Sequence, residues 1–312
     1  MQVMITGVGG LIGSNLADWI IRNKPEVHVI GIDDFSGSYQ ENVNEQVKLY
    51  KLNIAEHSMD DIFTQYKFDL IFHFAAYAAE GLSPFVRSFN YKNNLIVTAK
   101  LITNAIKFNV GRFIFTSSMA TYGRGNTPFN EEDDLAPIDP YGIAKMAAEL
   151  DIKIANDQHG LDYCIIRPHN LYGPNQNIWD KYRNVLGIWM NQHLNGQPIS
   201  IYGSGKQKRA FSYIEDCLLP IWNAGVLDSA SKETINLGGT QPIEINNAAD
   251  LLLNIIGSGK KRYFQKRYEV KDAWSTWDKS VHLLNYKENI DLKTGLRNMW
   301  DWVKKQPKRN RN

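Results

Sequence analysis

Residues 1–20, MQVMITGVGGLIGSNLADWI, decide the fold of this 312-residue chain. An apolar run typical of a strand leads into glycines with the spacing GxxGxxG, and a helical pattern follows over about residues 10–22. Glycines between a strand and a helix let the backbone approach a pyrophosphate at the positive end of the helix. Gly7, Gly10 and Gly13 therefore predict a phosphate-binding turn, whereas a turn that only packs the helix would explain Gly13 alone.

Beyond this stretch, apolar runs of strand length alternate with helical patterns, as in VHVIGI, VKLYKL, DLIFHFA and GRFIFTSS. Continuous apolar strands are typical of parallel sheets that helices cover on both faces. We predict an α/β fold, with a Rossmann-type doubly wound sheet over residues 1–168 that includes a helix beginning near Pro140. Residues 169–305 are predicted to form mostly a smaller substrate-binding lid, some strands of which are left free to return to the main sheet. Residues 306–312 form a basic tail, for which solvation is the simplest interpretation.

The second predicted strand ends at Asp33, twenty residues after Gly13. A carboxylate at this place can accept hydrogen bonds from the adenosine ribose hydroxyls and would repel a 2′-phosphate. The sequence therefore favours NAD over NADP as the cofactor. Asp34 is the alternative for this role, or it caps a loop.

The composition excludes several classes of function. A formal net charge of +2 gives no overall field that would attract nucleic acid or a membrane surface. The two cysteines, Cys164 and Cys217, form no CxxC pair, and the seven histidines form no HExxH motif, so we expect free thiols and no metal. No signal peptide and no apolar run of 18 residues is present, which predicts a soluble cytoplasmic protein.

Two Tyr-x-x-x-Lys matches occur, Tyr141 to Lys145 and Tyr202 to Lys206, and about one is expected by chance. Glycines inside the second match argue against a helix, so its side chains need not share a face. The first match begins a predicted helix in DPYGIAKMAAE, downstream of a parallel strand that ends in Ser117 and Ser118. Only the first match therefore has a setting in which the two side chains can act together.

In this setting Tyr141 is a candidate general base. A free tyrosine has a pKa of about 10, so a base near neutrality needs a shift of roughly 3 units. A nearby ammonium lowers such a pKa, and Lys145 lies one helical turn away. Lys145 can also bind the nicotinamide ribose, and Ser118 can hold the reacting sugar oxygen. The alternative is an amphipathic helix with a half-buried tyrosine and a lysine that reaches to the solvent.

The chain resembles the extended short-chain dehydrogenase/reductase family, in particular its NAD-dependent nucleotide-sugar epimerase and dehydratase branch of the UDP-glucose 4-epimerase type. The resemblance rests on TGVGGLIGSN, VIGIDD, HFAA, NYKNN, FIFTSSMATYG, YGIAK, RPHNLYGPNQN, YGSGKQKRAFSYIED and LLNY…GLRNMWDW. These stretches span almost the whole chain in the order of the family. It implies a catalytic triad of Ser118, Tyr141 and Lys145 and a homodimer formed through the long helix before Phe108 and the helix of Tyr141.

The resemblance also implies the ligand contacts. Beside the glycine turn and Asp33 or Asp34, it places at the cofactor Leu11, Ile12, Asn53, Ile54, Phe74, Ala75, Ala76, and Asn93 or its neighbour Asn94. At the nucleotide-sugar it places Ser118, Met119, Asn170, Arg209, and either Arg267 or Lys266. His169 could be an acid or base, but a loop histidine held by backbone contacts is the favoured interpretation.

The reaction is predicted from what the sequence lacks. The dehydratases of the resembled family carry an Asp-Glu pair directly after the catalytic hydroxyl residue, the decarboxylases carry a glutamate at the second of these positions, and the 3,5-epimerases carry a cysteine there. This chain has Met119 and Ala120. The minimal triad that remains suffices for 4-epimerisation of a nucleotide-sugar, with UDP as the expected carrier. The alternatives are a 4-keto-sugar reductase, another nucleotide-sugar epimerase, and a non-catalytic NAD sensor or scaffold.

The identity of the sugar stays open. Ala273 falls near the position where the 4-epimerases use side-chain size to admit an N-acetyl group, so its small size suggests a fit for bulkier 2-substituents or acidic sugars. Glu80 and Arg87 depart from the commonest 4-epimerase pattern. These two residues either read the sugar or pair on the surface.

Overall fold

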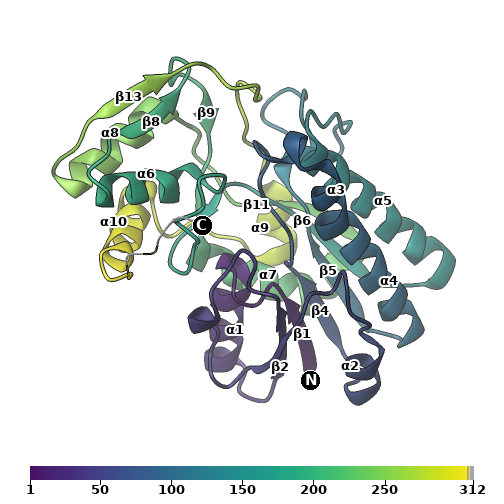
Figure 1. Cartoon of the computed structure of the whole chain (residues 1–312). Coiled ribbons are helices and arrows are strands. Elements are labelled where there is room, and N and C mark those ends of the chain that lie inside the picture. Colours follow the sequence, from purple (N-terminus) through teal and green to yellow (C-terminus); the bar gives the residue numbers. More distant parts are fainter. Residues whose placement is uncertain (308, 310–312) are drawn as a thin grey trace.

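The computed structural model describes residues 1–307 and 309 (Figure 1). Its centre is a seven-stranded parallel sheet that confirms the predicted fold class. From one edge to the other, the strands are β11 (Glu233–Leu237), β6 (Tyr163–Pro168), β5 (Arg112–Thr116), β4 (Leu70–His73), β1 (Gln2–Thr6), β2 (His28–Asp33) and β3 (Lys48–Lys51).

Helices cover both faces of this sheet because alternate residues of each strand point to opposite sides. In β1, Val3 and Ile5 belong to one hydrophobic core and Met4 to the other. The helices of the first core are α1 (Leu11–Asn23), α7 (Ile214–Val226) and α9 (Asp278–Leu284). The second core lies under α2 (Asp60–Gln65), α4 (Val97–Lys107) and α5 (Pro140–His159); the short α3 (Arg87–Tyr91) and a π-helical turn over Lys92–Ile96 precede α4.

The lid lies beside the carboxyl ends of the strands, in the upper left of Figure 1. Its own core joins three helices to short strand pairs. The helices are α6 (Val185–Leu194), α8 (Ile245–Ile256) and α10 (Leu292–Val303). The strand pairs are β8 (Ile199–Tyr202) with β13 (Lys261–Phe264), β9 (Lys208–Arg209) with β12 (Ile243–Glu244), and β7 (Leu171–Tyr172) with β10 (Ser212–Tyr213).

The main sheet takes one strand from beyond residue 168. β11 pairs in parallel with β6, and α7 packs on the same sheet. The lid and the sheet domain are therefore interleaved along the chain, so the sheet is complete only after residue 237. A division at residue 168 does not separate two independent folding units.

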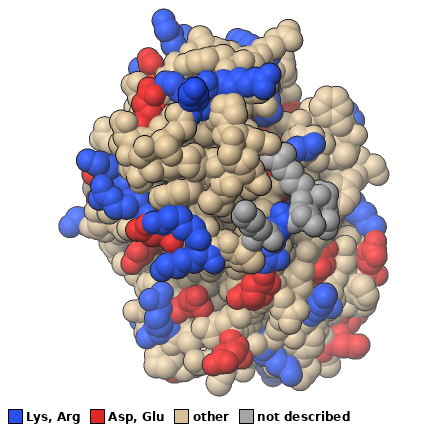
Figure 2. All heavy atoms as spheres, turned by 60° about the vertical axis from the view of Figure 1, so that its left-hand side comes forward, with Lys and Arg blue, Asp and Glu red and all other residues tan. Residues whose placement is uncertain are grey.

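The charges of the surface are mixed. In the view of Figure 2, basic and acidic side chains both appear, separated by wide uncharged areas. No helix within residues 1–307 is long and apolar enough to cross a membrane. In the same part of the chain, no group of three or more His, Cys, Asp or Glu residues could hold a metal ion.

Candidate active site

The glycine turn has the tight geometry that its sequence predicts. Gly7 has φ +71°, and a Cβ atom there would lie 2.7 Å from the backbone nitrogen of Ala75. A Cβ atom on Gly13 would lie 2.3 Å from the carbonyl oxygen of Gly7. Gly10 is the N-cap of α1, and it has no side chain between the helix end and the cavity. The turn therefore fits the diphosphate of a dinucleotide, which needs close access to backbone N–H groups.

Asp33 organises the loop above this turn. Its carboxylate accepts hydrogen bonds from the backbone of Gly9 at 2.9 Å, from the backbone of Phe35 at 2.8 Å and from the hydroxyl of Ser38 at 2.9 Å. Burial raises the pKa of Asp33 in spite of these bonds. Asp34 accepts from the backbone and hydroxyl of Ser36, which makes it the cap of the loop. Asp33 thus has a structural task in addition to the ribose contact that we predict for it.

A cavity of ≈ 1260 Å³ follows the carboxyl ends of the strands. This volume lies above the range of about 300–1,000 Å³ that is usual for the pocket of one small molecule. The residues that our sequence analysis assigns to cofactor and substrate all line it: Gly7, Gly10, Leu11, Ile12, Gly13, Asp33, Asp34, Asn53, Ile54, Phe74, Ala75, Ala76, Asn93, Ser118, Met119, Tyr141, Lys145, Asn170, Arg209 and Arg267.

Tyr141 and Lys145 lie together at the start of α5. Asp139 caps this helix by accepting from the backbone nitrogens of Tyr141, at 2.8 Å, and Gly142, at 3.0 Å. The Lys145 Nζ atom lies 5.9 Å from the centroid of the Tyr141 ring and donates to the carbonyl oxygen of Thr116 at 2.6 Å. The end of β5 and the first turns of α5 therefore bring the two side chains to one place.

The pKa of Tyr141 differs from our expectation. Burial raises it, the nearby carboxylate of Glu80 raises it further, and a hydrogen bond with Ser118 lowers it. In the protein without its cofactor the pKa of Tyr141 is therefore raised rather than lowered, and Lys145 is not among the groups that lower it. Burial lowers the pKa of Lys145 itself to about 7, although Glu149 acts in the opposite direction. A lysine with this pKa is a weaker source of positive charge than the sequence suggested.

A buried network under the site was missed by our sequence analysis. The Ser117 hydroxyl donates to the carboxylate of Glu149, which also pairs with Arg167 through bonds of 3.0 and 2.6 Å. Arg167 donates to the hydroxyl of Tyr122 at 2.8 Å. In the sequence, two features could have indicated this network: the arginine inside the apolar strand YCIIRP and the glutamate on the buried face of α5. Ser117 is therefore held away from the role that we predict for Ser118.

Two pairs of neighbouring candidates can be compared. Asn93 lines the cavity, whereas Asn94 is buried and its side chain bonds both to the backbone nitrogen of Tyr77, at 2.8 Å, and to its carbonyl oxygen, at 3.2 Å. Arg267 lines the cavity and stacks on Tyr202, with 3.4 Å from the guanidinium carbon to the ring centroid, whereas Lys266 is not part of the lining. The geometry favours Asn93 and Arg267.

The other lid candidates are held by the backbone or by a buried hydroxyl. Asn170 donates to the carbonyl of Ala210 at 2.8 Å. Arg209 donates to the carbonyls of residues 208, 270 and 271. His169 is fully buried, and its Nε2 lies 2.6 Å from the Ser275 hydroxyl, so a side chain replaces the expected backbone contacts. Burial lowers the pKa of His169 to about 4, and the residue does not line the cavity.

The loop over residues 174–183 lies across the loop over residues 35–42, and we call this junction the loop clasp. Asn177 donates to the carbonyl of Gly37 at 3.1 Å, and Asn42 donates to the carbonyl of Asn175 at 3.3 Å. Arg309 stacks on Tyr39, with 3.7 Å from its guanidinium carbon to the ring centroid, so this tail residue is not simply solvated. The rest of the predicted tail beyond Pro307 lies outside the described residues.

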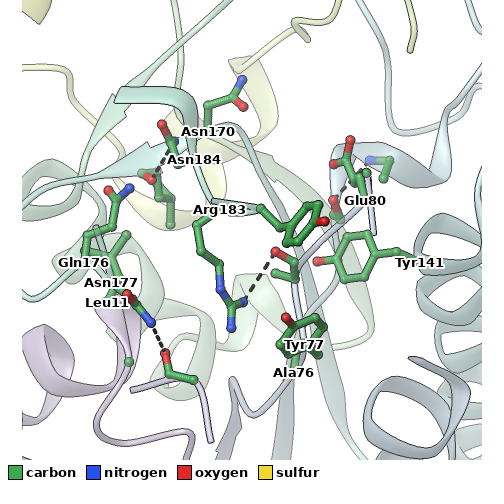
Figure 3. A pocket seen from close by; sticks show the side chains of 18 of the residues that line it. Leu11, Ala76, Tyr77, Glu80, Tyr141, Asn170, Gln176, Asn177, Arg183 and Asn184 are labelled. Atoms are coloured by element: carbon green, nitrogen blue, oxygen red, sulfur yellow. Dashed lines mark hydrogen bonds between the residues drawn. The ribbon is translucent and has the colours of Figure 1, made fainter. Parts of the chain in front are cut away.

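Arg183 also lines the cavity, although none of our predictions from the sequence assigned it a role. It pairs with Asp180 at 3.0 Å, donates to the carbonyl of Ala78 at 3.4 Å, and lies over the ring of Tyr77 (Figure 3). The charged turn WDKYRN was the signal that could have revealed it.

Most of the chain matches a known protein family. Residues 3–238 match the model of the NAD dependent epimerase/dehydratase family. The chain belongs to this family. The resemblance to extended short-chain dehydrogenases is therefore confirmed, and the chain is an enzyme of an NAD-dependent family.

Members of this family with solved structures are similar over the whole chain. A UDP-glucose 4-epimerase from Thermotoga maritima, solved with UDP-glucose, is 29% identical with a TM-score of 0.93, covering 98% of this chain and 99% of that one. A UDP-glucuronic acid 4-epimerase from Bacillus cereus, solved with UDP-glucuronic acid and NAD, is 26% identical with a TM-score of 0.90, covering 97% and 99%. A UDP-glucuronate 4-epimerase of Thermodesulfobacterium geofontis is 28% identical over 96% of this chain and 95% of its own length.

Proposed function

We propose that the protein is an NAD-dependent 4-epimerase of UDP-sugars. One observation carries the proposal. Tyr141, Ser118 and Lys145 converge on the cavity at the end of β5, and Met119 and Ala120 stand where dehydratases, decarboxylases and 3,5-epimerases are expected to carry a further acid, base or thiol. The 4-epimerases among the relatives support this choice of reaction.

The residues of the glycine turn would hold the cofactor diphosphate, and Asp33 would accept from the adenosine ribose. The Oδ1 atom of Asp33 already accepts two hydrogen bonds and Oδ2 accepts one, so Oδ2 keeps one acceptor site for a ribose hydroxyl. The chemistry that bound NAD would supply is reversible hydride transfer at C4 of the sugar, to and from opposite faces of the ring. A cofactor that ends each cycle unchanged can stay bound throughout turnover.

The chain supplies the proton transfer. The Tyr141 oxygen takes the proton of the C4 hydroxyl, while Ser118 donates a hydrogen bond to that hydroxyl and fixes its position. Because burial and Glu80 raise the pKa of Tyr141, positive charge must be brought close for the phenol to ionise. We assign this task to Lys145 together with the positive ring of the oxidised cofactor. Glu149 helps to keep Lys145 charged.

The lid would hold the UDP part of the substrate. Arg209 and Arg267 bring two guanidinium groups to the cavity wall, and such groups match the oxygens of a diphosphate. Ala273 also lines the cavity and is 4% exposed. We retain the hypothesis that its small side chain leaves room for a 2-N-acetyl group, which turnover of UDP-glucose without turnover of UDP-N-acetylglucosamine would contradict.

The decisive experiment uses the purified protein without added cofactor. It is incubated with UDP-, GDP-, CDP- and dTDP-sugars, and proton NMR follows the configuration at C4. Interconversion of a C4 pair without a net change in NADH absorbance is the expected result. Consumption of added NADH by a 4-keto sugar, without epimerisation, would identify a reductase instead. No reaction in either assay would point to a sensor or scaffold.

A further inference from the structure

Glu80 lies on the cavity wall next to Tyr141, and the proposed reaction gives it no task (Figure 3). Its position is set through Ser83. The Ser83 hydroxyl donates to the Glu80 carbonyl oxygen at 2.9 Å and accepts from the backbone nitrogen of Tyr141 at 3.3 Å. The backbone of Glu80 is thereby tied to the first turn of α5. Arg87, the other departure noted in this segment, does not line the cavity.

The carboxylate of Glu80 faces the cavity (Figure 3). Within the described residues, no hydrogen bond or ion pair joins it to another side chain, and solvent reaches it in the cavity. Asp139, which acts electrostatically on Glu80, is engaged in capping α5. Arg209 acts on Glu80 electrostatically, but its guanidinium is already bonded to carbonyl groups and lies 3.4 Å from Glu269. An unpaired carboxylate beside a catalytic residue is the kind of group that contacts a substrate.

The proposed reaction brings both faces of the sugar ring to this wall. The ring must turn over between the two hydride transfers, so a substituent at C5 is carried from one side of the site to the other. A hydroxymethyl group can donate a hydrogen bond to a carboxylate. The carboxylate that a uronate carries at C5 instead cannot donate one, and its negative charge is repelled by a like charge at close range.

Resting on the 4-epimerase function proposed above, we propose that Glu80 selects uncharged sugars: it accepts a hydrogen bond from a sugar hydroxyl and repels the carboxylate of uronates. This proposal narrows the range of sugars that the small side chain of Ala273 suggested. A sugar with a 2-N-acetyl group remains compatible with Glu80, whereas an acidic sugar does not. The substrate expected for this chain therefore differs from the glucuronates that appear in the names of two relatives.

The test measures binding rather than turnover. Dissociation constants of UDP, UDP-glucose and UDP-glucuronate are determined by calorimetry at pH 8 for NAD-saturated protein, using the wild type, Glu80→Gln and Glu80→Ala. Glu132→Gln is the matched control, because Glu132 is exposed and does not line the cavity. The wild type and the control should bind UDP-glucuronate at least about tenfold more weakly than UDP-glucose. Both Glu80 variants should lose most of this difference without a change for UDP.

Glutamine keeps the shape of the side chain, and thermal unfolding checks that both variants fold. Equal binding of the two sugars by the wild type, or a ratio that survives in Glu80→Gln and Glu80→Ala, would overturn the inference and leave the epimerase function standing. Failure of UDP and of every UDP-sugar to bind would overturn both.

The pH dependence gives a second readout. Protein around the cavity raises the pKa of Glu80 to about 7, even though the side chain remains open to solvent. The groups that face Glu80 are Asp139, Tyr141, Arg209 and Glu269. A sugar carboxylate titrates near pH 4, so it stays ionised while Glu80 gains a proton below its pKa. Discrimination should therefore weaken as the pH falls from 8 to 6 in the wild type and stay constant in Glu80→Gln; weakening of equal size in Glu80→Gln would contradict the inference.

Discussion

At the scale of single residues, burial of Lys145 lowers its pKa and so reduces the positive charge that its proposed role requires. Its side chain is 2% exposed, and burial lowers its pKa to about 7. In an unfolded chain a lysine titrates near pH 10.4, so the unfolded state binds more protons than the folded state between these two values. The folded protein therefore gains stability as the pH rises through this window, and it loses that gain as the pH falls.

Replacement of Lys145 by methionine should remove this dependence. Between pH 7 and pH 9 we expect the free energy of unfolding of the wild type to change by about 1–2 kcal/mol more favourably than that of Lys145→Met, because all other titrating groups are common to both proteins. The window ends at pH 9 because tyrosines begin to titrate above it. Urea unfolding at both pH values measures the difference, with Lys153→Met on the same helix as the control. Equal slopes for the wild type and Lys145→Met would show that Lys145 keeps its ordinary pKa.

Tyr141→Phe removes only the hydroxyl group that we assign to proton transfer. The rate of C4 epimerisation should fall by about 10²–10⁴-fold, as is usual when a general base is lost. Tyr66→Phe is the control, because Tyr66 lies outside the cavity lining and pairs with Tyr50. Bound NAD, measured after denaturation, should be the same in both variants. If Tyr141→Phe keeps the epimerisation rate of the wild type, Tyr141 is not the general base that we propose.

At the scale of elements, the turn between β1 and α1 depends more on Gly13 than on Gly10. A Cβ atom on Gly13 would meet backbone at 2.3 Å, whereas one on Gly10 would lie 3.3 Å from the Gly7 carbonyl oxygen. Gly13→Ala should lower the free energy of unfolding by about 1–3 kcal/mol, because the overpacked turn must shift, and it should reduce the NAD that copurifies. Gly10→Ala should cause a smaller loss of both, as measured by denaturation and by cofactor release. Identical losses would show that the close approach at Gly13 is not decisive.

The elements that could be predicted from sequence are those with local signals. The glycine turn, the apolar strands and the α5 start at Asp139-Pro140 each carry their own residues for the structure that they adopt. The lid strands could not be placed in the same way, because pairs such as β9 with β12 contain only two residues each and depend on contacts distant in the sequence. The return of β11 to the main sheet was left open for the same reason. Within the site, the types of the functional residues could be predicted from the sequence. The sequence could not show that the Asp139 carboxylate caps α5 while the Glu80 carboxylate stays free to meet a ligand, because this difference depends on contacts between distant segments.

At the scale of the whole molecule, an apolar stripe on α5 is exposed. Ile143, Leu150 and Ile154 follow helical spacing and are 37%, 53% and 50% exposed, and Ile96, beside α4, is 50% exposed. α4 and α5 pack side by side, and we propose that a second copy of the chain binds here to form a four-helix contact, as the resemblance implies. An apolar patch of this kind is costly in a monomer.

Ile154→Glu should therefore shift the protein from dimer to monomer in sedimentation experiments, because a charge would be buried in the contact. Val281→Glu is the control, since Val281 is 40% exposed on α9, a helix of the opposite face of the sheet. A wild-type monomer, or a dimer that survives in Ile154→Glu, would contradict the proposed interface.

The loop clasp also depends on a residue that is far from both of its loops in the sequence. Arg309 stacks on Tyr39 of one loop and lies with its guanidinium carbon 5.1 Å from the ring centroid of Trp179 in the other. A single cation thus connects two segments that the chain itself separates by more than a hundred residues. A protease that cuts only mobile loops should therefore cleave both segments faster in Arg309→Ala than in the wild type.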